Sequence, residues 1–281
     1  MKYLVTGIDG QLAAAFARRF EDSGLDFKHP SVDITDFEAV MKVVDGYRPD
    51  VILNCAAYNF VDKAETDHVQ AFRVNAFGPA LLSHAAKKYN SALVHYGSDY
   101  VFDGSKKAPY TETDPVNPLN QYGKSKLEGE RLAAEAGARI LILRLSWVFG
   151  QGRQNFIYKL REWAKDGRTL KIADDEISVP TCADDVVDVT LKALEAGLAG
   201  VYHLTNSGAA SRYDYAGLVL KELGLKNGLE RASYLDFNLP AKRPGFSAMS
   251  NRKISDELGI NIPAWEDSVI SFLKKERHEK N

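Results

Sequence analysis

The sequence predicts an α/β protein with a doubly wound parallel sheet, followed by a smaller C-terminal lobe. Short apolar runs alternate with amphipathic stretches through the first half of the 281 residues, and this pattern loosens after residue 150. The apolar runs lack strict polar alternation, which is typical of parallel strands buried on both faces. Strands that alternate with helices indicate βαβ units, and right-handed crossovers then give a doubly wound sheet.

In the first half we expect strands at 3–5, 25–28, 51–56, 92–96 and 139–145. Helices are expected at 11–23, 36–47, 66–89 and 119–136, with Thr35 as the cap of the second helix. Ligands of such sheets bind at the carboxyl ends of the strands. The residues that directly follow the strands are therefore the candidate site.

In the second half we expect helices at 155–166, 184–198, 213–223 and 265–277 and a strand at 201–204. The stretch 236–250 has no clear period, and the charge-dense tail 274–281 is expected to be solvated and frayed. Residues 151–281 should form mostly the smaller, substrate-binding lobe, with some segments returning to the domain formed by 1–150.

Composition excludes several classes of partner. A formal net charge of −2 gives no reason to expect nucleic acid or an anionic membrane as a partner. The two cysteines favour a reducing compartment over a disulfide, and the six histidines do not cluster at metal-ligand spacing, so we expect no metal site. No signal peptide and no run of about 18 apolar residues is present, so a cytoplasmic protein is expected.

A glycine turn follows the first strand. Gly7 and Gly10 precede the first helix, and Ala13 stands where dinucleotide sites often have a third glycine. Such a turn lets backbone N–H groups at a helix N-terminus meet a pyrophosphate, so the turn favours a Rossmann-type dinucleotide-binding domain over residues 1–150. The alternative is a plain βα turn that requires a positive φ.

The end of the second strand bears on the choice of cofactor. An acidic residue there would bind the ribose 2′-hydroxyl of NAD, but the chain has the basic pair Lys28 and His29. This pair suits the 2′-phosphate of NADPH better, with NADH as the second choice. The two residues could equally be ordinary surface residues.

Tyr122 and Lys126 are spaced i and i+4, so on a helix they share one face. Reduction of a ketone requires a proton donor, and a nearby ammonium lowers the pKa of a phenol toward the neutral range. Ser98 follows the fourth strand and could donate a hydrogen bond to the carbonyl oxygen. An exposed helix pair is the alternative, but the glycine turn, Ser98 and the Tyr122–Lys126 helix occur at the places where a hydride-transfer site would require them.

These motifs resemble the dTDP-4-dehydrorhamnose reductase family, a branch of the extended short-chain dehydrogenases. The resemblance covers nearly the whole chain and is carried by these segments: GIDGQL at 7–12, NCAAY at 54–58 with VDKAE at 61–65, GSDYVFDG at 97–104, YGKSKLEGE at 122–130, 144–150 with Trp147, Pro180–Thr181, GVYHL at 200–204, and KRP at 242–244 with Ser247.

The resemblance implies reduction, with NADPH or NADH, of the 4-keto group of a nucleotide-linked 6-deoxyhexose, giving dTDP-L-rhamnose. It assigns the catalytic roles to Ser98, Tyr122 and Lys126, with Ser98 in the place of the family's usual threonine. The implied cofactor-lining residues, besides Tyr122 and Lys126, are Gly7, Gly10, Gln11, Leu12, Asp33, Ile34, Ala56, Ala57, Tyr58 and Tyr96. The implied substrate residues, besides Ser98, are Asp99, Tyr100, Trp147 and Arg243, with the Arg243 guanidinium paired to the diphosphate. The resemblance is also compatible with a homodimer.

Three departures leave the exact sugar open. The chain has Asn59 and Phe60 where smaller residues are common, Gly97 in place of a serine, and 175–178 in place of a segment that usually holds a glutamine and a glycine. Two other functions stay open as well. One is an NADP-binding regulatory subunit of a partner enzyme such as methionine adenosyltransferase, and the other is a nucleotide-sugar epimerase or dehydratase.

Overall fold

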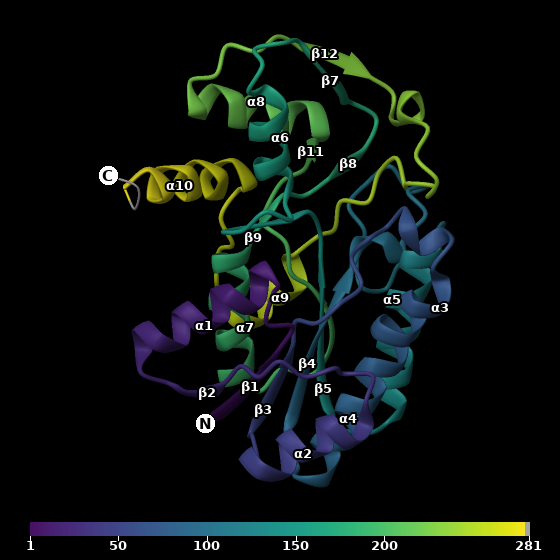
Figure 1. Cartoon of the computed structure of the whole chain (residues 1–281), viewed down its shortest axis with the longest axis vertical. Helices are drawn as coiled ribbons and strands as arrows, with labels where there is room; N and C mark the ends of the chain where they lie inside the picture. Colours follow the sequence, from purple (N-terminus) through teal and green to yellow (C-terminus); the bar gives the residue numbers. More distant parts are fainter. Residues whose placement is uncertain (279–281) are drawn as a thin grey trace.

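The computed structural model describes residues 1–278 and contains a six-stranded parallel sheet with helices on both faces (Figure 1). The strand order is β10-β5-β4-β3-β1-β2. The bounds are β1 Lys2–Thr6, β2 Asp26–Lys28, β3 Val51–Asn54, β4 Ala92–Ser98, β5 Arg139–Leu145 and β10 Gly200–His203. The expected fold class is confirmed.

Two helical layers cover the sheet. One face packs on α1 (Gln11–Ser23), α7 (Ala183–Glu195) and α9 (Arg252–Leu258). Phe16 and Phe20 of α1 are fully buried against the sheet. The other face packs on α2 (Phe37–Tyr47), α4 (Gly78–Lys88) and α5 (Gln121–Glu135). Both layers use apolar strand residues, which explains the absence of strict alternation in the sequence.

A second core forms the lobe above the carboxyl ends of the strands (Figure 1). Its helices are α6 (Phe156–Ala164), α8 (Arg212–Leu223) and α10 (Trp265–His278), packed around the fully buried Tyr215. Three short pairs complete it: β6 (Val148–Phe149) with β9 (Thr181–Cys182), β7 (Leu170–Ala173) with β12 (Leu229–Ala232), and β8 (Ile177–Ser178) with β11 (Ala210–Ser211). The first two pairs are parallel, and the pair of β8 with β11 is antiparallel.

Two local features differ from the predictions. Thr35 does not cap α2: Asp36 accepts from the Ala39 amide, while Thr35 donates to Asp33. The expected helix 66–89 contains α3 (His68–Phe72), a π-helical turn (Arg73–Phe77) and α4, preceded by a 3₁₀ turn (Lys63–Glu65). The extra residue of a π turn re-aims side chains, and here it directs Asn75 to the backbone of Tyr58.

The stretch 236–250, which shows no clear period in the sequence, overlaps the end of a 3₁₀ turn (Tyr234–Phe237). A further 3₁₀ turn (Asp99–Val101) follows β4. Of the tail 274–281 that was predicted to be frayed, residues 274–278 belong to α10, and residues 279–281 lie outside the described residues. Within residues 1–278, no helix is both long and apolar enough to cross a membrane.

Candidate active site

Three adjoining cavities lie between the carboxyl ends of the strands and the lobe. The tyrosine cavity, of about 280 Å³, contains Ser98, Tyr122 and Lys126. The glycine cavity, of about 490 Å³, lies at Gly7 and Gly10. The lobe cavity, of about 470 Å³, is walled by aromatic and basic side chains of the lobe. The glycine cavity shares Gly10, Ala57 and other lining residues with the tyrosine cavity, so the two form one continuous groove.

The glycine turn is built for close backbone approach. Gly7 has φ +79°, and a Cβ at this position would lie 2.7 Å from the Ala56 nitrogen. Gly10 precedes α1 in an extended conformation and caps the helix without any side-chain hydrogen bond. Amide groups in the first turn of α1 therefore face the groove, and Ala13, fully buried, lets the helix pack on the sheet. These features fit the pyrophosphate of a dinucleotide.

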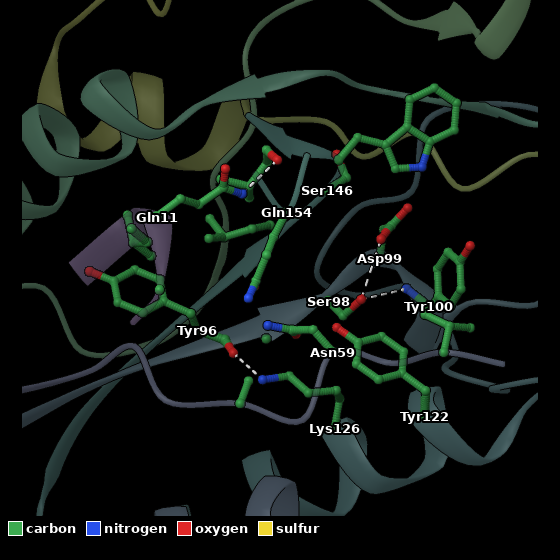
Figure 2. Close-up of a pocket in the computed structure, with 18 of the residues that line it drawn as sticks. Gln11, Asn59, Tyr96, Ser98, Asp99, Tyr100, Tyr122, Lys126, Ser146 and Gln154 are labelled. Carbon is green, nitrogen blue, oxygen red and sulfur yellow. Dashed lines mark hydrogen bonds between the residues drawn. The ribbon is translucent and has the colours of Figure 1, made fainter. Parts of the chain in front are cut away.

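The structure brings most of the expected cofactor residues to this groove. Those that line it are Gly7, Gly10, Gln11, Leu12, Asp33, Ile34, Ala56, Ala57, Tyr96, Tyr122 and Lys126. Tyr58 lines none of the three cavities. Its backbone is held by Asn75 and its hydroxyl donates to Asp67 at 3.0 Å, so it supports the loop after β3 from behind. The ring of Tyr96 points away from Tyr122 (Figure 2) and its hydroxyl meets Thr190.

The basic pair at the end of β2, Lys28 and His29, does not line the groove. The Lys28 ammonium lies over the Tyr47 ring, 4.9 Å from its centroid, and neither Lys28 nor His29 lines any of the three cavities. The groove wall beyond β2 is made by Ser31, Val32 and Asp33 instead. The positions of Lys28 and His29 therefore do not support the sequence argument that this pair binds a 2′-phosphate.

Tyr122 and Lys126 project from one face of α5 into the tyrosine cavity (Figure 2). Asn120 caps this helix by accepting from the Gly123 amide at 2.7 Å, and its own amide donates to the Lys242 carbonyl in the lobe. Lys126 is 3% exposed, and its ammonium donates to the Tyr96 carbonyl at 2.5 Å. The helix thus positions both side chains, and the bond to β4 near its carboxyl end also holds Lys126.

Burial dominates the electrostatics of this pair. It raises the pKa of Tyr122 to about 12, while a hydrogen bond to Ser98 acts in the opposite direction and the Asp99 carboxylate adds to the rise. This direction differs from the lowering expected from a lysine neighbour, because burial of the phenol outweighs the other effects on its pKa. Burial lowers the pKa of Lys126 to about 8, and Glu130, one helical turn further on, opposes that fall.

Ser98 and Asp99 connect β4 to the lobe. The Ser98 hydroxyl accepts from the Tyr100 amide and donates to Asp99 at 3.3 Å. The other Asp99 oxygen accepts from Ser178 at 2.8 Å and from Ser247 at 2.6 Å, both in the lobe. Burial raises the pKa of Asp99 to about 6, against the effect of these serine hydrogen bonds.

The expected substrate residues separate into two positions. Asp99, Tyr100 and Trp147 line the tyrosine cavity, whereas Arg243 lines only the lobe cavity. The Arg243 guanidinium forms a two-bonded pair with Asp62 at 3.0 and 2.7 Å. Asn59, which the sequence singled out as a departure near the sugar, lines the tyrosine cavity. The sequence interpretation missed other lining residues, including Cys55, Gln154 and Arg212. Gln154 and Arg212 lie in the lobe without a motif.

The fold and the groove that runs from the glycine turn to Tyr122 are those of an extended short-chain dehydrogenase/reductase. A family model described as RmlD substrate binding domain matches residues 1–278. The dTDP-4-dehydrorhamnose reductase of Aggregatibacter actinomycetemcomitans is 36% identical, covering 95% of this chain and 97% of its own. The chain belongs to the dTDP-4-dehydrorhamnose reductase family, and the resemblance inferred from its motifs is confirmed.

Solved structures agree. A dTDP-4-dehydrorhamnose reductase from Clostridium acetobutylicum superimposes with a TM-score of 0.95 at 32% identity, covering 99% of this chain and 100% of that chain. A dTDP-4-dehydrorhamnose reductase from Bacillus anthracis, solved in complex with NADP, gives a TM-score of 0.94 at 29% identity, covering 98% of this chain and 99% of that chain.

Proposed function

We propose that this chain reduces the 4-keto group of a nucleotide-linked 6-deoxyhexose, with dTDP-4-dehydro-L-rhamnose as the first choice of substrate and dTDP-L-rhamnose as its product. The observation that carries the proposal is the presence of Ser98, Tyr122 and Lys126 in one cavity, continuous with a groove that fits a dinucleotide. Membership of the reductase family supports the choice of substrate. The protein would act in the cytoplasm, and a homodimer stays a prediction.

The dihydronicotinamide supplies, when bound, the hydride that adds to C4 of the sugar. Tyr122 gives its hydroxyl proton to the former ketone oxygen, so that an alcohol forms and Tyr122 is left as a phenolate, which solvent then reprotonates. Ser98 donates a hydrogen bond to the same oxygen and must release Asp99 to do so. Lys126 stabilises the phenolate and holds the nicotinamide ribose.

The same proposal assigns the remaining positions. Asp99, Tyr100 and Trp147 would face the sugar, and Arg243 would lie on the nucleotide side of the substrate. NADPH is proposed as the donor, with NADH as the alternative. The relative from Bacillus anthracis solved with NADP supports this order. Titration of both cofactors should show NADPH binding at least as tightly as NADH, and clearly tighter binding of NADH would refute it.

The decisive experiment follows the loss of NADPH absorbance with a panel of 4-keto nucleotide sugars. NADPH consumption that matches the substrate added supports the reductase. A new product without net NADPH consumption would indicate an epimerase or dehydratase. No consumption with any member of the panel, together with a stable complex with a second protein, would indicate a regulatory subunit.

A further inference from the structure

Arg212 occupies the junction between the tyrosine cavity and the lobe cavity. These two cavities share Trp147, Val148, Gln154 and Arg212 as lining residues. Among the residues that the structure describes, Arg212 is the only cationic side chain that lines both. Lys126 lines only the first of these two, and the other cations of the lobe cavity (Lys159, Lys171, Arg243) do not reach the tyrosine cavity.

The Arg212 guanidinium is stacked and has few polar partners. Its central carbon lies 3.4 Å from the centroid of the Trp147 ring and 5.2 Å from that of Phe156. Its nearest carboxylate, Glu176, is 3.6 Å away, beyond ordinary hydrogen-bond length. Within residues 1–278 no hydrogen bond from this guanidinium is formed, although its side chain is only 21% exposed. Stacking therefore fixes the plane of the group and leaves its N–H donors available.

Arg243 is in the opposite situation. Two of its nitrogens bind Asp62, one of these also donates to the Ala241 carbonyl, and the third lies 3.2 Å from Glu176. An anion that binds Arg243 must compete with two carboxylates. Arg243 is thus suited to bracing the lobe against the loop after β3, and Arg212 is suited to a new anionic partner.

The backbone of Trp147 gives an independent indication. Its φ is +39°, a strained left-handed conformation that bulky residues rarely adopt. This conformation places the indole between the two cavities, under the guanidinium. Strain of this kind persists where the surrounding structure maintains it, commonly at ligand sites.

We infer that Arg212, stacked on Trp147, binds the phosphate that joins the sugar to the nucleotide. The inference rests on the proposed function in one respect: a sugar ketone at Tyr122 and a nucleotide in the lobe cavity place the diphosphate between the two cavities. A planar guanidinium at this point can form two parallel hydrogen bonds to one phosphate. Arg212 thereby fixes how far the sugar reaches toward Tyr122.

The test compares binding of dTDP and of thymidine to the NADP⁺-loaded protein, by calorimetry for dTDP and by ligand-observed NMR for thymidine. Arg212→Gln should weaken dTDP binding roughly 10- to 100-fold, as expected for a lost hydrogen bond to a charged group. Binding of thymidine and NADPH should stay within about twofold of the unmodified protein. Arg212→Lys keeps the charge without the planar fork, so it should give a smaller loss and provides a second variant if Arg212→Gln does not fold.

Arg231→Gln is the matched control, because Arg231 also lies over an aromatic ring, Tyr213 at 4.2 Å, and pairs with Asp174, but lines none of the three cavities. It should bind dTDP normally. Unchanged dTDP binding by Arg212→Gln, equal losses for dTDP and thymidine, or no binding of dTDP by the unmodified protein would each overturn the inference. Turnover is measured separately, so Arg212-dependent dTDP binding without any NADPH consumption would refute the proposed reductase and leave the inference standing.

Discussion

At the scale of single residues, the chemistry depends on one hydroxyl proton. Tyr122→Phe keeps the ring and its edge contact with Tyr100 but removes that proton. Turnover should fall about 10²- to 10⁴-fold, the usual contribution of general acid catalysis, with little change in NADPH affinity. Tyr213→Phe, which alters a tyrosine of the lobe, is the control in steady-state assays. Near-normal turnover of Tyr122→Phe would rule out its role as proton donor.

The pH profile tests the state of Lys126. Its pKa is about 8, so the ammonium is present below that pH and is lost as the pH rises through it. If the ammonium is required, kcat/KM, which reports the free enzyme, should decline above about pH 8. Glu130 opposes the fall of this pKa, so Glu130→Gln should move the declining limb to lower pH.

Glu130 also pairs with the buried Arg144, at 2.7 Å, so unfolding of the Glu130→Gln variant must be checked first. Glu128→Gln, on the exposed side of the same helix, removes an equal charge and should leave the limb in place. A limb that does not move in Glu130→Gln, or that moves equally in Glu128→Gln, contradicts this account of Lys126.

The sequence predicted the reacting residues more readily than the residues that surround them. Ser98 and the Tyr122–Lys126 pair occur in short motifs whose spacing reflects one helix face or one strand end. Arg212 begins a helix of the lobe and reaches the cavities only through the tertiary packing of that lobe, which no local spacing encodes. The same holds for the carboxylates that pair with Arg243, since Asp62 is distant from it in the chain.

At the scale of elements, α5 is pressed against its neighbours through glycines. A Cβ at Gly129 would lie 1.9 Å from the Asn75 carbonyl oxygen in the π-helical turn. Gly97 meets a similar restriction, because a Cβ there would lie 2.3 Å from a Glu130 oxygen. The family usually has a serine at this position, and here the buried Glu130 carboxylate occupies the space that a side chain would need.

Gly129→Ala should therefore destabilise the protein, by about 1–3 kcal/mol, the usual cost of overpacking. Gly46→Ala is the matched control, because Gly46 lies in α2 with nothing within 4 Å of the added Cβ. That change should stabilise the protein by about 0.4–1 kcal/mol through the unfolded state. Denaturant unfolding measures both free energies, and equal stabilities of the two variants would contradict the close contact between α5 and the π turn.

Strands and helices of the first half were predicted to within a few residues, because their apolar runs are long and periodic. The two-residue strands of the lobe were not found, since a pair such as β6 and β9 is too short to show a period. The π turn was missed for another reason. It keeps a helical hydrophobic pattern on both sides, and its extra residue is visible only in the hydrogen bonds.

At the scale of the whole molecule, the proposed substrate spans the sheet and the lobe. Binding energy from the nucleotide, remote from the reacting carbon, would then hold the ketone at Tyr122. A 4-keto-6-deoxyhexose without its nucleotide should show a lower kcat as well as weaker binding, in NADPH-consumption assays at saturating cofactor. An unchanged kcat for the truncated sugar would show that the nucleotide does not orient the reacting group.

The division of the chain at residue 150 stays a prediction. The sequence predicted a strand at 201–204 and a return of some later segments to the first domain, but it did not predict where that strand lies in the sheet. Whether such a run joins one edge, the other edge or a separate sheet depends on long-range pairing, and the structure pairs β10 with β5. Nothing near residue 200 encodes that partner.

The position of β10 also constrains how the chain folds as it is synthesised. The sheet ends at β5 until residues 200–203 leave the ribosome, and the apolar side of α1 lacks its α7 partner until residues 183–195 have emerged. For much of translation the nascent chain thus presents an unpaired strand edge beside uncovered apolar side chains, the two features that invite aggregation. Slow translation between residues 150 and 203 would prolong this exposure, and a chaperone that shields strand edges would shorten it.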